Sequence, residues 1–118
     1  MKENVVQVKS YHFAVRIVRL SQFLVKEKKE YVLSKQLLRS GTSIGANVEE
    51  AIGGQSKKDF ISKMSISYKE ARESQYWIRL LFDTDYIDES QKKEYLLLID
   101  ELLKIIGSII KSSKDNNS

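Results

Sequence analysis

Two glycines lie four residues apart in the stretch RSGTSIGANVEEA, residues 39–51, among serine, threonine and asparagine side chains. Glycine-rich stretches of this kind can bind phosphate through backbone amides. A Walker-type loop requires Gly-x-x-x-x-Gly-Lys-Ser/Thr between a buried strand and a helix. Here Gly45 is followed by Ala46 and Asn47, and the preceding residues 33–40 have helical periodicity. A dinucleotide-binding fingerprint would need a third glycine and a preceding strand. The sequence therefore argues against a nucleotide-binding loop.

The titratable residues give little basis for catalysis. His12 is the single histidine of the chain, which excludes the paired Glu-x-x-His metal sites of helical bundles. Glu70 and Glu73 share a helix face, but carboxylates without histidine or cysteine make a poor transition-metal site. No spacing of histidine, serine and aspartate suggests a catalytic triad. We predict no catalytic residue, no metal, no cofactor and no small-molecule substrate. An enzyme would require a metal or ligand at Glu70 and Glu73.

Apolar residues recur at spacings of three and four along almost the whole chain, which is the pattern of amphipathic helices. The predicted helices cover about residues 5–28, 31–52, 57–82 and 91–111. Gly53 and Gly54 should end the second helix, because glycine tolerates the left-handed conformation that terminates helices. Ser56, followed three residues later by Asp59, should cap the third helix.

The length of 118 residues suits one domain, and the chain has no proline and only five glycines. These features disfavour a sheet-rich fold with many tight turns. The helix pattern with short links predicts an all-α protein, an antiparallel up-down-up-down four-helix bundle over residues 1–113. Residues 114–118 lack apolar side chains to bury and are predicted to form a disordered tail.

The glycines fall inside the second predicted helix rather than in a loop. Its apolar stripe runs through Leu33, Leu37, Gly41, Ile44, Val48 and Ile52. Gly41 therefore occupies a core-facing position, and Gly45 lies one turn further on. Glycine costs about 1 kcal/mol relative to alanine inside a helix. We predict that both glycines allow another backbone, or a bulky residue such as Trp77, to approach closely.

A polar stripe lies beside the glycines and consists of Gln36, Arg39, Ser43, Asn47 and Glu50. The favoured interpretation is a solvated helix surface on which serine and asparagine make local hydrogen bonds. The alternative is contact with polar residues of the third helix, namely Lys69, Glu70, Arg72, Glu73 and Gln75. In that arrangement Arg39 could form an inter-helix ion pair with a glutamate.

The first predicted helix has two apolar stripes. One contains Val6, Phe13, Ile17, Leu20 and Leu24, and the other contains Tyr11, Val15, Val18 and Val25. Two stripes give more apolar surface than one intramolecular seam requires. The second stripe indicates either a wide core face or contact with another subunit.

The net charge is +4, and the first third of the chain carries the excess. Residues 1–39 contain nine lysines and arginines against three acidic residues. Such an asymmetry can attract RNA or DNA. The predicted phosphate ligands are Lys9, Arg16, Arg19, Lys35 and Arg39. The absence of cysteine, of a signal peptide and of an apolar run near 20 residues predicts a cytoplasmic protein without a membrane span.

Three segments of the sequence resemble a known family. The segments are KSYHFAVRIVRL (9–20), LSKQLLRSGTSIGANVEEA (33–51) and KKDFISKMSISYKEARESQYWIRLL (57–81). They are similar to 23S rRNA intervening-sequence proteins, and the resemblance covers about residues 8–110. It implies an antiparallel four-helix bundle that assembles into a ring-like homopentamer. The family is also similar to the accessory variability determinant of diversity-generating retroelements, a basic pentameric barrel that works with a reverse transcriptase and nucleic acid.

The resemblance marks characteristic positions without assigning them a catalytic role. These positions are Gln36, Arg39, Ser40, Ser43, Ile44, Asn47, Glu50, Phe60, Glu70, Glu73 and Trp77. The leading hypothesis is a non-enzymatic homo-oligomer that binds RNA or DNA through basic residues. The alternative is an oligomeric scaffold, or a bundle that binds a protein partner, with no nucleic-acid role.

Overall fold

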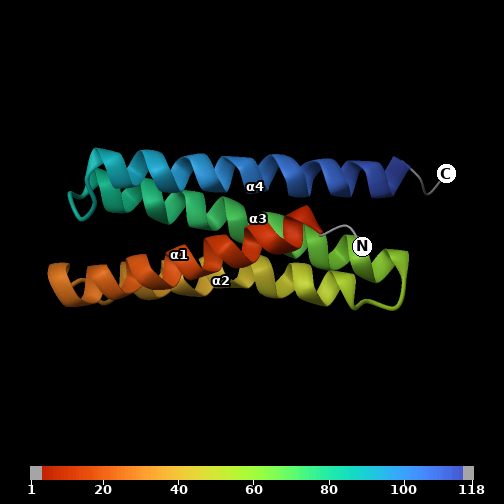
Figure 1. Ribbon diagram of the computed structural model, residues 1–118, viewed down its shortest axis with the longest axis horizontal. Helices are drawn as coiled ribbons and strands as arrows, with labels where there is room; N and C mark the ends of the chain where they lie inside the picture. The colour runs from red at the N-terminus through yellow and green to blue at the C-terminus, as the bar shows by residue number, and fades with distance from the viewer. Residues whose placement is uncertain (1–3, 116–118) are drawn as a thin grey trace.

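The computed structural model describes residues 4–115, and in that range it contains four helices and no strand (Figure 1). The helices are α1 (Val5–Lys28), α2 (Leu33–Ile52), α3 (Lys57–Asp83) and α4 (Glu89–Asp115). The prediction of an all-helical protein with four helices is confirmed. Figure 1 shows the helices extending along the long axis of the molecule, whose principal extents are 49 × 26 × 20 Å.

Contacts between neighbouring helices follow a descending register, which means that they pair residues in opposite sequence order. Gln7, near the start of α1, donates a hydrogen bond to Glu49, near the end of α2 (2.6 Å). The same order joins the other neighbours through the pairs Ser67–Ile44, Ser74–Ser40, Gln75–Asp100 and Lys9–Glu101. As the residue number rises along one helix, it falls along the helix beside it. The register therefore brings residues far apart in sequence to the same level of the molecule.

The second helix begins at Leu33, two residues later than predicted. The carboxylate of Glu30 accepts hydrogen bonds from the backbone amides of Ser34 (2.8 Å) and Val32 (3.4 Å). The Ser34 hydroxyl in turn donates to the carbonyl of Glu30 at 2.7 Å. These bonds satisfy amides that have no partner in the first turn of a helix. Tyr31 and Val32 consequently belong to the exposed link between α1 and α2.

The second helix ends at Ile52, just before Gly53, as predicted, but not for the predicted reason. Gly53 has φ −81°, and none of the glycines that the structure describes has a positive φ. Gly54 instead permits a close approach of neighbouring atoms. A Cβ atom at Gly54 would lie 2.5 Å from the carboxylate of Asp59 and 3.0 Å from the carbonyl oxygen of Ala51. The absence of a side chain, rather than a left-handed backbone, suits glycine to this turn.

Side-chain caps define the starts of the last two helices. The Ser56 hydroxyl accepts a hydrogen bond from the amide of Asp59 (3.0 Å), which confirms the predicted cap of α3. At α4, Asp88 accepts from the amide of Gln91 (2.8 Å), and the Gln91 side chain accepts from the amide of Asp88 (2.9 Å). This reciprocal capping box starts α4 at Glu89 rather than at residue 91.

The last helix also extends further than predicted. Residues 112–115 continue α4, so the prediction of disorder is wrong for residues 114 and 115, and residues 116–118 lie outside the described part. No glycine or proline lies between Gly107 and Asp115, so nothing in that segment ends the helix. Serine, lysine and aspartate each cost less than about 0.7 kcal/mol per helical position. Without a competing structure, that penalty is too small to end the helix.

The second stripe predicted for α1 is largely exposed, whereas the core between the four helices includes the first stripe of α1 and the stripe of α2. The fully buried members of the core are Phe13, Ile17, Leu24, Leu37, Ile44, Val48, Met64, Ala71, Ile78, Leu81, Ile99, Leu102 and Ile106. The ends of the predicted stripes are less covered, and Ile52 is exposed. Several serines are also buried, and every buried side-chain nitrogen or oxygen in residues 4–115 has a hydrogen-bond partner.

Helices α3 and α4 have 27 residues each, whereas α1 has 24 and α2 has 20. By the register of Lys9 with Glu101, the first residue of α1 lies level with about residue 105 of α4. The last two to three turns of α4 therefore extend beyond α1 and lie alongside α3 (Figure 1). Among the described helices, none is long and apolar enough to cross a membrane.

Candidate nucleic-acid interface

Three of the five predicted phosphate ligands are paired with carboxylates inside the molecule. Lys9 of α1 forms an ion pair with Glu101 of α4 at 3.1 Å. Arg16 pairs with Glu94, and its guanidinium lies over the ring of Tyr95, 5.7 Å from the centroid. These contacts join α1 to α4. A cation that already has a carboxylate partner must break that pair before it binds phosphate, which makes these residues weaker candidates.

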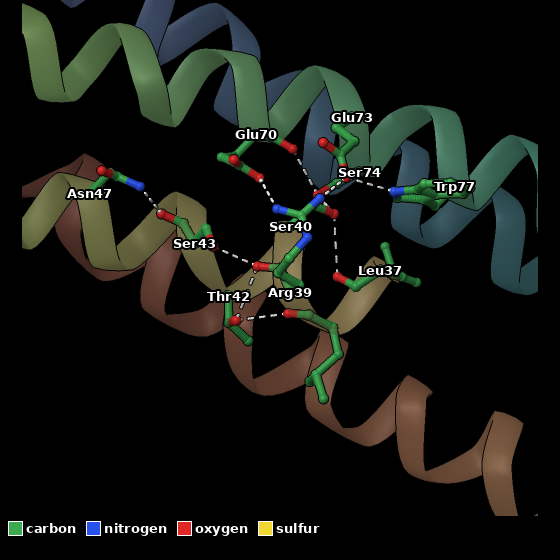
Figure 2. Close-up of polar contacts among 11 residues, drawn as sticks. Leu37, Arg39, Ser40, Thr42, Ser43, Asn47, Glu70, Glu73, Ser74 and Trp77 are labelled. Atoms are coloured by element: carbon green, nitrogen blue, oxygen red, sulfur yellow. Dashed lines mark hydrogen bonds and ion pairs between the residues drawn. The ribbon is translucent and has the colours of Figure 1, made fainter. Parts of the chain in front are cut away.

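Arg39 is the third paired cation, and it bridges α2 and α3 (Figure 2). Its guanidinium reaches Glu70 at 3.2 Å and also bonds to Glu73. The same oxygen of Glu73 accepts a hydrogen bond from the indole nitrogen of Trp77 at 2.9 Å. The predicted ion pair between Arg39 and a glutamate of the third helix is confirmed. Glu70 and Glu73 both bind the Arg39 guanidinium, so in this structure they serve as a contact between α2 and α3.

Buried hydroxyl groups lie directly behind this network. Ser74 of α3 donates to the hydroxyl of Ser40 of α2 at 2.9 Å, and Ser67 donates to the carbonyl oxygen of Ile44 at 2.9 Å. Serine is small, so α2 and α3 can pack closely while the buried polar atoms remain hydrogen-bonded. The network around Arg39 therefore closes the solvent side of a tight helix pair.

We expect Glu73→Ala to lower the free energy of unfolding by about 1–2 kcal/mol, because the half-buried Trp77 indole loses its acceptor. Glu73→Gln keeps an acceptor but loses the charge, and should cost about 0.5–1 kcal/mol because Arg39 is half exposed. Urea unfolding followed by the fluorescence of Trp77, the only tryptophan in the chain, measures both. Equal stability of Glu73→Ala and the unaltered protein would contradict this role.

The rest of the predicted polar stripe on α2 behaves mainly as a local helix surface. Ser43 donates to the carbonyl of Arg39 (2.6 Å), and Asn47 donates to the carbonyl of Ser43 (2.8 Å). Gln36 is exposed. Glu50 makes an ion pair with Lys63 of α3 at 3.0 Å, and the hydrogen bond that the Lys63 ammonium donates to this carboxylate raises the pKa of Lys63. Local hydrogen bonds, the favoured interpretation, thus coexist with three ion pairs to α3, two of them from Arg39 and one from Glu50.

Both glycines of α2 face α1. A Cβ atom at Gly41 would lie 2.8 Å from Cγ2 and 2.9 Å from Cγ1 of Ile17. At Gly45 it would lie 3.3 Å from the carbonyl oxygen of Ser10. The prediction of close helix packing is confirmed. The backbone of Ser10 approaches Gly45 as predicted, whereas the bulky side chain at Gly41 is Ile17 rather than Trp77. Gly41 has no room for a Cβ atom and Gly45 has little, so α1 and α2 approach one another closely here.

The remaining predicted phosphate ligands, Arg19 and Lys35, are exposed. Within residues 4–115, neither forms an ion pair with a carboxylate. Arg19 lies in the middle of α1 and Lys35 in the first turn of α2, so the structure leaves them on separate helices. Lys9 and Arg16 contact α4 whereas Arg39 contacts α3, so the five predicted ligands do not form one continuous basic site.

Other exposed cations lie on α3 and α4, and the sequence did not predict them as phosphate ligands. Lys69, Arg72 and Arg79 on α3 and Lys104 on α4 are exposed, and none pairs with a carboxylate in the described part of the chain. The charge totals instead favoured phosphate ligands in the first third of the sequence. The spacing of three and seven residues between the α3 cations was the signal that could have identified a shared face.

The described residues contain no group of three or more histidine, cysteine, aspartate or glutamate side chains that could hold a metal ion. His12 is exposed and lines a small depression between α1 and α4 with Lys9 and Glu101. The ion pair between that lysine and that glutamate occupies the polar side of the depression. Lys9 and Glu101 therefore balance each other's charge in this depression without a ligand.

Comparisons with known proteins agree with this architecture. Residues 2–108 match the family described as 23S rRNA-intervening sequence protein. A crystal structure of a protein with unknown function from the S23 ribosomal protein family of Bacteroides thetaiotaomicron VPI-5482 is 55% identical to this chain, with a TM-score of 0.91. The match covers 94% of this chain and 99% of that chain. No curated protein matches the sequence. The chain belongs to the 23S rRNA-intervening sequence protein family.

Proposed function

We propose that the protein is a non-enzymatic, homo-oligomeric helical bundle that binds RNA through exposed basic side chains. The observation that carries the proposal is the surplus of surface cations without a carboxylate partner. In residues 4–115, the lysines and arginines that pair with a carboxylate are Lys9, Arg16, Arg39 and Lys63. The other cations are available to phosphate groups, which supply most of the affinity of non-specific RNA binding. An RNA ligand also implies a cytoplasmic location.

We also infer that the helices form an antiparallel up-down-up-down bundle. The descending register of the inter-helix contacts supports this topology. The links between helices, residues 29–32, 53–56 and 84–88, are short. Short links join helices that run in opposite directions, because a parallel neighbour would need a connection as long as the helix. This topology places all three links at the two ends of the bundle.

The outward apolar stripe of α1 supports the homo-oligomer. Tyr11 is 72% exposed, and Val18 and Val25 are each 39% exposed. Beside this stripe, residues of α1 and α2 line a groove of about 580 Å³ whose walls are mostly apolar. Contact with another copy would cover these side chains. The family resemblance supports a pentamer.

RNA binding should weaken steeply with salt. We expect a fluorescein-labelled single-stranded 20-nucleotide RNA of mixed sequence to bind at 25 mM KCl. Each phosphate contact contributes about −0.7 to the slope of log K against log[salt]. Four contacts would therefore give a slope of about −3. Fluorescence anisotropy across a salt series measures the slope. The proposal fails if no binding occurs at 25 mM KCl, or if the affinity does not depend on salt.

The alternative function is an oligomeric scaffold without a nucleic-acid role. The ion pairs of Lys9, Arg16 and Arg39 favour it, because they give three prominent cations a structural purpose. Its expected result in the same experiment is normal assembly with no RNA binding at low salt. RNA binding at low salt, measured by anisotropy, therefore distinguishes the two functions.

A further inference from the structure

One helix of the bundle carries cations and an exposed aromatic ring on the same face. Lys69, Arg72, Tyr76 and Arg79 follow one another along α3 at spacings of three, four and three residues. Residues at these spacings lie on one side of a helix. All four side chains are exposed, and Tyr76 is 53% exposed. The outward side of α3 thus presents an aromatic ring between positive charges.

The neighbouring helix adds another cation to this side. Gln75 of α3 donates a hydrogen bond to Asp100 of α4 at 2.8 Å, which places these two residues at the same level. Three residues back along α3 and four residues on along α4 are Arg72 and Lys104. In the descending register these two therefore lie at nearly the same level, and both are exposed. We call Lys69, Arg72, Tyr76, Arg79 and Lys104 the α3–α4 basic face.

The charges of this face are not neutralised by ion pairs in the described part of the chain. Across residues 4–115, none of its four cations forms an ion pair with a carboxylate. Asp100 lies beside the face, and its carboxylate accepts the hydrogen bond from Gln75. The cations of α1 differ, because Lys9 and Arg16 both pair with glutamates of α4. The α3–α4 basic face is therefore better suited to bind an external polyanion than these two cations predicted from the sequence.

The aromatic ring indicates which polyanion would fit. An exposed tyrosine can stack on an unpaired base, and such stacking is a general feature of single-strand binding. The ring of Tyr76 packs edge-on against Trp77, with centroids 5.0 Å apart and an interplanar angle of 73°. Trp77 is in turn fixed by its hydrogen bond to Glu73. The ring is thus supported from behind while it remains exposed to solvent.

We propose that the α3–α4 basic face binds single-stranded RNA, with phosphates on Arg72, Arg79, Lys69 and Lys104 and a base stacked on Tyr76. This inference rests on the proposed RNA-binding function and adds its location. Arg72 and Arg79 are seven residues apart, about 10 Å along the helix axis. A strand that follows α3 would therefore pass Tyr76 between its two arginine contacts.

The test compares charge-matched double variants in the anisotropy assay with the labelled 20-nucleotide RNA. Arg72→Gln/Arg79→Gln should weaken binding at 25 mM KCl at least tenfold and reduce the salt slope by about 1.4, that is 0.7 for each contact. Tyr76→Leu should weaken binding about tenfold while it leaves the salt slope unchanged, because stacking is not a phosphate contact. The control Lys26→Gln/Lys29→Gln removes the same charge from α1 and its link, and should leave affinity within about twofold.

Each remaining outcome overturns a defined part of the inference. If Arg19→Gln/Lys35→Gln abolishes binding while Arg72→Gln/Arg79→Gln does not, RNA binding stands but its location is wrong. If Tyr76→Leu binds normally, or duplex RNA binds as tightly as the single strand, the stacking role is wrong. If the protein binds vesicles of phosphatidylserine but not RNA, and Arg72→Gln/Arg79→Gln removes vesicle binding, the face is a membrane surface and the inference fails. Far-ultraviolet circular dichroism should give equal helicity for all variants.

Discussion

Gly41→Leu is expected to lower the free energy of unfolding by about 3 kcal/mol and to disturb assembly. Even the first added carbon would lie 2.8 Å from a buried methyl group of Ile17, well inside van der Waals contact. Ile17 is fully buried and cannot move into solvent. Overpacking in a filled core typically costs about 1–3 kcal/mol, and leucine adds four carbons. Urea unfolding followed by circular dichroism at 222 nm measures the change.

A smaller substitution at the same position separates overpacking from helix propensity. Gly41→Ala should destabilise the protein, although alanine is favoured over glycine by about 1 kcal/mol in a helix. In an Ile17→Ala background, which removes the two atoms closer than 3 Å and leaves only a Cβ at 3.2 Å, the same change should be less destabilising. Gly107→Ala on α4 is the matched control, because its Cβ would lie 3.4 Å from the ring of Tyr68, an ordinary contact. A stabilising Gly41→Ala in the unaltered protein would refute the packing argument.

Val18→Glu is expected to convert the proposed homo-oligomer into single chains of 13.7 kDa. The side chain lies in the outward stripe of α1 and is 39% exposed in one chain. A glutamate can therefore be solvated in the separate chain, but it would be desolvated against a second copy. Burying an unpaired carboxylate costs several kcal/mol, enough to dissociate an oligomer. Multi-angle light scattering at micromolar concentration measures the mass, and the unaltered protein should give a multiple of the chain mass.

The control for this variant is Ile66→Glu on α3. Ile66 is a β-branched residue with 40% exposure, nearly the same as Val18. The two changes alter charge and intrinsic helix propensity alike, so only the location differs. Ile66→Glu should leave the oligomer intact. An unaltered protein of single-chain mass, or equal dissociation by both variants, would show that the α1 stripe is not the subunit interface.

The helices and their core faces could be predicted because one periodic signal determines both. Leu37, Gly41, Ile44 and Val48 recur at helical spacing, and all are buried. The helix ends were predicted less well because individual side chains decide them. Glu30 bonds to the first amides of α2, and Gln91 completes a reciprocal cap on α4. Such bonds depend on a few torsion angles that a periodic pattern does not contain.

The candidate site was harder to predict because it depends on which helices become neighbours. The Arg39 ion pair could be anticipated, since cation and glutamates lay on polar stripes of consecutive helices. The pairs of Lys9 and Arg16 join α1 to α4, the first and last helices of the sequence. A charge count over the first third of the chain does not detect carboxylates that distant. For the same reason it overlooked Arg72 and Arg79.

The unequal helix lengths have a consequence for the dynamics of the molecule. Beyond the level of Val5, the end of α4 lies alongside α3 without α1, and Ile105, Ile109 and Ile110 remain only partly buried there. Segments with fewer apolar contacts open at a smaller free-energy cost than the global unfolding. The last turns of α4 should thus exchange their amide hydrogens by local fraying, while amides near the core residue Ile99 exchange only when the whole bundle unfolds.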